Sequence, residues 1–327
     1  MNTSTKLGAY LLGVAVLFGG AIGAGRAVGP TGPPLPAAGG HGTHTTPAAS
    51  APASTSPPGL TTAGLPAPGG LQVSQDGYTL TPRSTTLRPG EATDLRFTVT
   101  GPDGRPVTGY QVQHDRRLHF MVVSRDLSGF QHLHPEEAGD GEWSVRLTLP
   151  EAGAYRAFAD FTPLGAGGMT LGTDLYAAGD YTPRALPPAS RTATVDGYTV
   201  TLDGDLVPGR SSKLTLTVSR DGRPVTDLQP YLGAYGHLVA LRAGDLAYLH
   251  VHPEGGPGDG RTAPGPGVTF QVEVPSRGDY RLYLDFRHAG TVRTADLTVS
   301  ARQHEPPAPT SPATPAHGAG QHDEHTH

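Results

Sequence analysis

The sequence contains no cysteine, and only 16% of its residues are charged. The absence of cysteine excludes disulfide bonds, thiolate metal sites, cysteine nucleophiles and a lipid-bearing N-terminal cysteine. Any metal site must therefore use His, Asp, Glu or Met side chains. The formal net charge of −5 is small, and no block of Lys or Arg occurs. A nucleic-acid partner is excluded because its electrostatic signature is missing.

A helical hydrophobic period is also missing, and short alternating runs take its place. The segment TDLRFTVT at 93–100 alternates apolar and polar residues, and EWSVRLTLP at 142–150 does the same. A period of two with one apolar face is typical of a half-buried strand. Turn sequences such as GPDGRP, AGDG and EAGA separate these runs. The pattern predicts an all-β fold.

The middle of the chain is an internal duplication. DGYTLT at 76–81 recurs as DGYTVT at 196–201, and YRAFADF at 155–161 recurs as YRLYLDF at 280–286. Seven or eight short strands in each half are typical of an immunoglobulin-like β-sandwich. We predict two tandem sandwiches, at 71–183 and 193–302, joined by a linker at 184–192. A single barrel built from both halves is disfavoured, because each half carries a full set of strands.

The two ends differ from the middle in composition. Residues 1–27 carry one lysine and then no charge until Arg26, which predicts a signal peptide or an N-terminal membrane anchor rather than a core helix. Residues 28–70, rich in Pro, Ala, Gly and Thr, predict a disordered spacer. Residues 303–327 predict a disordered His-rich tail that either gathers cations weakly or only aids solubility. We therefore expect the folded part to be secreted or held outside the cytoplasmic membrane.

Each half also carries a His-x-His-Pro-Glu motif, with a further histidine thirteen residues before its first histidine. In the second half, a two-residue type II′ turn at Gly244-Asp245 would place His237 opposite His252. His250 would then lie opposite Val239, on the same face of the hairpin. The predicted site in this half is His237, His250 and His252.

The first half repeats the spacing around a less regular turn. His119, His132 and His134 share a face for any even loop length, and Met121 lies on that face as well. A thioether beside imidazoles favours copper, whereas imidazoles alone suit Cu(II), Zn(II) or Ni(II). Copper is thus the expected cofactor, with zinc as the alternative. The other interpretation is that these histidines only form hydrogen bonds near the rim of a sandwich.

Carboxylates recur beside both motifs. Glu136 and Glu254 follow the histidine pairs, and Asp160 and Asp285 precede an aromatic residue in each copy. These groups could supply a fourth ligand or orient a ligand imidazole. More often, such residues are solvated charges at the rim.

With these motifs, residues 71–302 resemble the YtkA-like group of secreted bacterial sandwich domains and other actinobacterial exported proteins that carry HLHP. The resemblance implies an immunoglobulin-like fold outside the cell and an association with copper or other heavy metals. The chain departs from secreted copper carriers, since it lacks a Met-rich segment and a histidine at the start of its mature domain. Because of this departure, the resemblance does not specify which metal is bound.

Three functional hypotheses follow. The first is a non-enzymatic buffer or carrier with one three-histidine metal site per domain, whose partners are the ion, another metal-handling protein of the envelope and, through residues 1–27, the membrane. The alternative is a structural or interaction module of the cell envelope without metal. A metal hydrolase is disfavoured, because no carboxylate is clearly placed as a general base.

Overall fold

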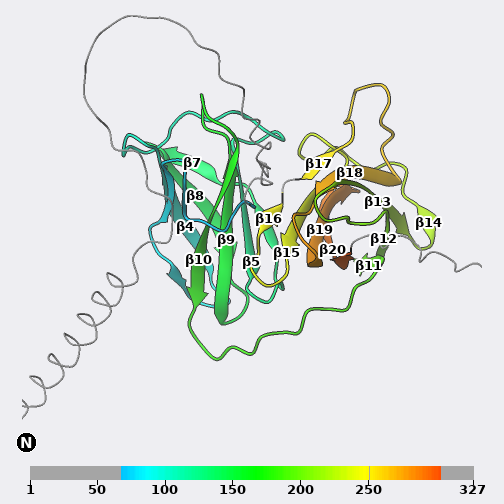
Figure 1. Ribbon diagram of the computed structural model, residues 1–327, viewed down its shortest axis with the longest axis horizontal. Helices are drawn as coiled ribbons and strands as arrows, with labels where there is room; N and C mark the ends of the chain where they lie inside the picture. The colour runs from blue at the N-terminus through cyan, green and yellow to red at the C-terminus, as the bar shows by residue number, and fades with distance from the viewer. Residues whose placement is uncertain (1–67, 250, 303–327) are drawn as a thin grey trace, which may run out of the picture. The chain divides into compact units, whose positions relative to one another are not determined.

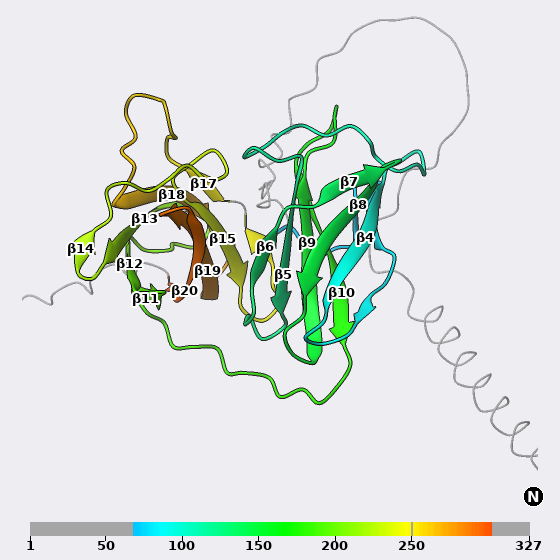
Figure 2. The same ribbon diagram turned by 180° about the vertical axis from the view of Figure 1, so that it is seen from behind.

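The computed structural model describes residues 68–249 and 251–302, which form two β-sandwiches joined by an extended linker (Figures 1 and 2). The prediction of two tandem immunoglobulin-like sandwiches is confirmed. These described residues contain no helix, and hence none long and apolar enough to cross a membrane. The predicted signal or anchor, most of the spacer and nearly all of the tail lie outside the described residues, as does His250.

The first sandwich consists of two five-stranded sheets, with the orders β1-β2-β4-β8-β7 and β3-β10-β9-β5-β6. Its strands are β1 Ser74–Gln75, β2 Tyr78–Pro82, β3 Thr86–Leu87, β4 Ala92–Thr100, β5 Leu118–Ser124, β6 Gln131–Leu133, β7 Glu136–Gly139, β8 Glu142–Thr148, β9 Gly153–Phe161 and β10 Met169–Ala177.

The second sandwich has one sheet with the order β11-β12-β13-β18-β17, to which β14 adds beside β13, and one with the order β16-β15-β19-β20. Its strands are β11 Thr192–Val195, β12 Tyr198–Asp203, β13 Ser211–Arg220, β14 Arg223–Pro224, β15 His237–Arg242, β16 Tyr248–Leu249, β17 Val251–Pro253, β18 Gly267–Glu273, β19 Gly278–His288 and β20 Thr291–Ala301.

The alternation in the sequence determines which side chains enter each core. In β4, Leu95, Phe97 and Val99 are buried, and Phe97 lies opposite Trp143 of β8 in the antiparallel ladder. The polar residues between them point outward, as a strand with one buried face requires. Burying large apolar side chains stabilises such a core by about 1.5–3 kcal/mol each.

Strands β5 and β15 are exceptions, because both of their faces are covered. Phe120 and Val122 of β5 enter the core of the first sandwich, and Leu238 and Ala240 of β15 enter that of the second. The opposite faces meet in one apolar cluster that both sandwiches share, which we call the junction core. The junction core consists of Met121, Val123, Leu127, Phe158, Val239, Leu241, Leu246, Tyr248 and Tyr283.

Candidate metal centre

The histidines of the first sandwich come together on one face of β5 and β6. Met121 lies directly opposite His132 in the ladder, so the same register brings His119 opposite His134, just beyond the end of β6. One ring nitrogen from each of His119, His132 and His134 lies within 4.8 Å of the others. Because Phe120 fills the core on the other face of β5, the histidine face is turned toward the second sandwich.

Two of these rings form a hydrogen-bonded chain. His119 Nδ1 lies 3.1 Å from His132 Nε2, and His119 Nε2 lies 3.1 Å from the carbonyl oxygen of Gln113. His132 Nδ1 lies 2.8 Å from Asp285 Oδ2 of the second sandwich. A carbonyl and a carboxylate only accept, so His119 Nε2 and His132 Nδ1 each donate a hydrogen.

This arrangement leaves two ring nitrogens facing each other. If all three contacts form, they require three hydrogens, whereas two neutral imidazoles carry only two. In that case a third proton is needed between His119 Nδ1 and His132 Nε2, and a metal cation bound by both nitrogens would take the place of that proton. Hydrogen bonds to the far nitrogens of ligand histidines are how proteins fix the tautomer and orientation of metal ligands.

The third histidine has an unused nitrogen. Nε2 of His134 is buried and has no hydrogen-bond partner among the described residues. Leaving a buried polar atom unsatisfied costs about 1–3 kcal/mol, so such an atom indicates a missing partner. Burial, together with the neighbouring His132, lowers the pKa of His134 to about 4. The ring is therefore neutral at pH 7, as a metal ligand must be.

Burial has the same effect on His119. Loss of solvation, followed by repulsion from His132, lowers the pKa of His119 to about 3, although its hydrogen bond to Gln113 opposes the shift. The ring is almost completely buried, with 3% of its residue surface exposed. His119 is thus a neutral imidazole at any physiological pH.

A fourth histidine joins the three from the second sandwich. The ring centroid of His237 lies 4.8 Å from that of His132 and 5.5 Å from that of His119. Burial and the neighbouring histidines lower the pKa of His237 well below its ordinary value. Asp285 lies directly opposite His237 in the β15–β19 ladder. We call His119, His132, His134, His237 and Asp285 the junction cluster.

The carboxylate of Asp285 is held firmly within this cluster. Thr294 Oγ1 of β20 donates to Asp285 Oδ1 at 2.5 Å, while Oδ2 accepts from His132. The side chains of His132 and Asp285 are 2% and 3% exposed. Of the four carboxylates singled out in the sequence, Asp285 is hydrogen-bonded to His132, and Asp160 lies directly opposite His119 in the β5–β9 ladder. Glu136 and Glu254 are exposed on the surface.

The predicted pairing of His237 with His252 is wrong. The register of the hairpin is as predicted, with Ala240 opposite Leu249, but β16 ends there. The chain then crosses to the other sheet, where β17 pairs with β18 and His252 lies opposite Gln271. Leu249 and Val251 both point into the core, so His252 points outward from the opposite sheet and is exposed.

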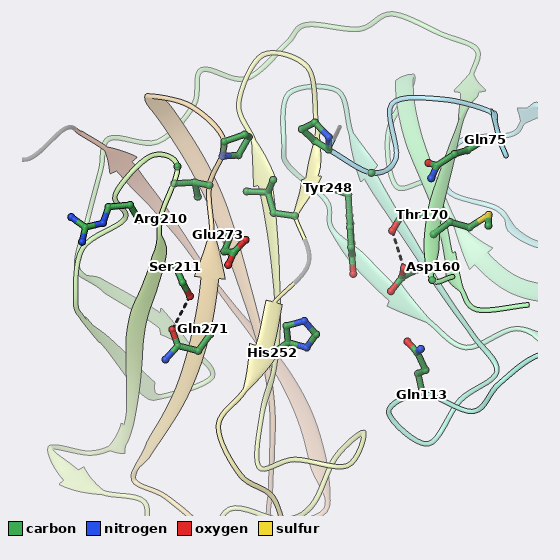
Figure 3. A pocket seen from close by; sticks show the side chains of 18 residues that line it. Gln75, Gln113, Asp160, Thr170, Arg210, Ser211, Tyr248, His252, Gln271 and Glu273 are labelled. Atoms are coloured by element: carbon green, nitrogen blue, oxygen red, sulfur yellow. Dashed lines mark hydrogen bonds between the residues drawn. The ribbon is translucent and has the colours of Figure 1, made fainter. Parts of the chain in front are cut away.

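The predicted two-residue turn is also wrong, although the register survives. The N–H of Leu246 donates to the carbonyl oxygen of Arg242 at 3.0 Å, so the turn is wider than Gly244-Asp245. His252 lines a cavity of about 610 Å³. Figure 3 shows Asp160 and Thr170 of the first sandwich across from His252. Thr170 donates to Asp160 Oδ1 at 2.8 Å.

Met121 is completely buried in the junction core, opposite His132. Its place on the histidine face agrees with the predicted register, but its apolar neighbours give it a packing role in any case. In the second sandwich Val239 holds the corresponding position of the repeat. Copper as the preferred ion stays a prediction that rests on this thioether.

Some members of the site were missed in the sequence. His114 lies between β4 and β5, with its ring 5.4 Å from that of His237 and 6.1 Å from that of His119. Tyr231 lies beside His134, and burial together with Asp285 raises the pKa of Tyr231 to about 12. Neither residue belongs to a repeated motif, so the comparison of the two halves could not find them.

Comparison with known proteins identifies the family. A family model described as Domain of unknown function (DUF8832) matches residues 72–171 and again residues 193–303. The chain belongs to this family. The two matches correspond to the two sandwiches, so the family's domain occurs twice in tandem. No protein of curated function matches the sequence.

Solved structures resemble the chain only distantly. The E. coli adhesin FdeC is 17% identical over 70% of this chain and 65% of its own, with a TM-score of 0.23. The Yersinia pseudotuberculosis adhesin InvE is 14% identical over 70% and 60%, with a TM-score of 0.21. The D0-D1 domain of intimin is 11% identical over 67% and 96%, with a TM-score of 0.18. Such values give no basis for transferring a function.

Proposed function

We propose that the chain is a non-catalytic, extracytoplasmic binding protein that holds one transition-metal ion in the junction cluster. The observation that carries this proposal is the convergence of three imidazoles on one point. His119 and His132 use their outer nitrogens for Gln113 and Asp285, which leaves their inner nitrogens 3.1 Å apart. The buried, unpartnered Nε2 of His134 supports a third ligand.

The spacing of the rings supports the same proposal. Imidazoles bound to one ion at about 2.0–2.1 Å in tetrahedral geometry have ring centroids roughly 5 Å apart. The centroids of His119, His132 and His134 are separated by 5.0–5.5 Å. Only small side-chain movements would thus be needed to receive an ion.

The chemistry of the site limits the ion and the role. Imidazole ligands suit Cu(II), Zn(II) and Ni(II), and exclude a preference for Mg²⁺ or Ca²⁺, which bind oxygen ligands. Copper is our first choice, because of Met121, and zinc the second. A buried ion enclosed by protein suits storage or transfer, and we propose a buffer or carrier role outside the cytoplasmic membrane, consistent with the apolar N-terminal sequence.

Calorimetric titration with Cu(II) and Zn(II) tests the proposal. We expect one high-affinity equivalent per chain, rather than the two that the repeated motif alone suggests. Removing residues 303–327 separates any weak binding by the tail. The matched control is His252→Ala, which removes a motif histidine outside the cluster, against His132→Ala inside it. Equal affinities in these two variants would refute the proposal.

A second candidate is a structural or interaction module of the envelope that binds no metal. One observation favours it: a shared proton between His119 and His132 would satisfy the same 3.1 Å contact without an ion. Thermal unfolding with and without a chelator separates the two candidates. A metal-free module should show the same unfolding temperature in both conditions, whereas a metal centre should lose several degrees.

A further inference from the structure

The two sandwiches contact each other through equivalent surfaces of the repeat. Phe130 of the first sandwich stacks on Tyr283 of the second, with centroids 4.0 Å apart and an interplanar angle of 10°. In the reverse sense, Tyr248 of the second packs against Phe158 of the first at 5.8 Å. The repeat relates Phe130 to Tyr248 and Phe158 to Tyr283. The junction thus has the reciprocal pattern of a two-fold interface.

Polar groups lie within this otherwise apolar junction. The Tyr283 hydroxyl donates to the carbonyl oxygen of Leu127 at 2.7 Å, and Asp285 accepts from His132. A buried carboxylate bound to a histidine of another domain carries a desolvation cost that apolar residues would not. Such a group in the centre of an interface indicates a binding role in addition to packing.

His237 occupies the side of the junction cluster that faces the three histidines of the first sandwich. Its centroid distances of 4.8 Å to His132 and 5.5 Å to His119 fall within the range of roughly 5 Å expected for ligands of one ion. Three imidazoles from one domain leave a tetrahedral ion one open position, which a fourth imidazole can fill.

We infer that His237 is the fourth ligand of the metal centre and that Asp285 positions His132, so that metal binding and docking of the two sandwiches are linked. The inference rests on the proposed function. The first sandwich supplies three ligands and the second supplies the fourth ligand and the orienting carboxylate. The docked arrangement therefore binds the ion more tightly than either sandwich alone.

The linkage has a definite size. If the docked form binds the ion about 100 times more tightly than the undocked form, a saturating concentration of the ion raises the ratio of docked to undocked molecules about hundredfold. Reciprocally, separating the sandwiches must weaken metal binding by the same factor. The bound ion thus stabilises the docked arrangement. A partner protein that removes the ion would shift the equilibrium toward the undocked form.

The first part of the test concerns affinity. His237→Gln should weaken zinc binding at least tenfold, and Asp285→Asn should weaken it 10- to 100-fold, because orienting partners of ligand histidines have effects of this size. His252→Ala is the control and should stay within threefold of the native protein. For Asp285, the Co(II)-loaded protein adds a second readout: a changed absorption spectrum reports altered ligand geometry, which a purely structural role would leave unchanged.

The second part measures docking directly. Because the chain has no cysteine, spin labels can be placed at Asp94→Cys and Asp221→Cys, two exposed positions on different sandwiches. Zinc is diamagnetic and leaves the labels unperturbed. In the protein that keeps His237, we expect zinc to narrow the distribution of distances between the two spin labels. The His237→Gln variant should need a higher zinc concentration, in proportion to its weaker binding, for the same narrowing.

The outcomes separate the inference from the proposed function. If the native chain binds no zinc or copper, the metal centre itself is refuted. If it binds one equivalent but His237→Gln binds within threefold of native, or if the distances do not respond to zinc, only the inference is overturned. Circular dichroism spectra of each variant confirm that a loss of binding does not come from unfolding.

Discussion

The hairpins β5–β6 and β15–β16 have the same histidine spacing and yet place their histidines differently. In the first, the chain stays beside β5 through Leu133 and crosses to the opposite sheet only at β7. In the second, the crossing comes earlier, between β16 and β17. Spacing therefore determines which face a side chain points from, and the crossing point determines which sheet that face belongs to.

This difference turns a tandem repeat into an asymmetric molecule. Two similar domains could each hold an ion, but only the first keeps its described motif histidines together. The second contributes His237 and Asp285 to the cluster of the first. Among the described residues, the two halves of the repeat thus contribute different side chains to one junction cluster.

The largest expected effect comes from breaking the ligand set itself. His132→Ala removes the nitrogen that faces His119 and leaves Asp285 buried without its imidazole partner. We expect Kd for zinc or copper to rise at least 100-fold. His252→Ala, which removes an exposed motif histidine of the second sandwich, should change it less than threefold. Competition titration with a chromophoric chelator measures Kd for both variants. Equal effects would contradict the claim that only the motif histidine of the first sandwich belongs to the site.

The two aspartates of the repeat give the next effect. Asp285→Asn should weaken metal binding 10- to 100-fold, since it alters the partner of His132. Asp160→Asn, at the corresponding position of the first sandwich, should leave the affinity unchanged and reduce only stability, because Asp160 accepts from Thr170 and contacts Tyr248. Similar losses of affinity in both variants would show that the two halves are functionally equivalent.

The low pKa values predict how the metal-free protein responds to acid. The pKa of His119 falls from an ordinary 6.5 to about 3 on folding, so below pH 6.5 the unfolded chain takes up a proton that the folded chain does not. Stability is thus complete above pH 6.5 and is lost as pH falls from there toward about 3, with a slope of up to about 1.4 kcal/mol per pH unit for this group.

Urea unfolding between pH 7 and pH 5, in the presence of a chelator, measures that slope. His119→Gln should reduce the slope of stability against pH by up to about 1.4 kcal/mol per pH unit, which corresponds to one proton. His252→Gln should reduce this slope by less. If the native protein and His119→Gln lose stability in parallel, His119 is not held neutral by the fold.

The smallest effect concerns Met121 and its counterpart Val239. Met121→Leu nearly preserves volume and should cost less than about 1.5 kcal/mol of stability. If the thioether assists copper, Cu(I) affinity should fall about tenfold while Zn(II) affinity stays constant. Val239→Leu is the control, with no change in selectivity expected. Unchanged Cu(I) affinity would restrict Met121 to packing and remove the reason to prefer copper.

Much of the fold follows from local rules in the sequence. Alternation in β4 and β8 identified their core faces, and the spacing of His119, His132 and His134 identified their shared face. Even the β15–β16 register came out correctly, although the turn between the strands is wider than predicted. These features depend on the two-residue period of a β-strand, which can be recognised from residues that are close in the sequence.

What could not be predicted depends on contacts between distant residues. His132 and Asp285 are 153 positions apart and meet because two sandwiches pack through equivalent faces. The early crossing at β17 likewise depends on the pairing of Val251 with Val272 in another sheet. No local pattern encodes either event, and the comparison of the two halves suggested a symmetry that the structure does not keep.

The most direct test of the central claim is an anomalous difference map from crystals of the zinc- or copper-loaded protein. We predict one strong peak per chain, about 2.0–2.1 Å from ring nitrogens of His119, His132 and His134, with His237 as the fourth ligand. A map with no peak at this position, or with separate peaks in the two sandwiches, would contradict it.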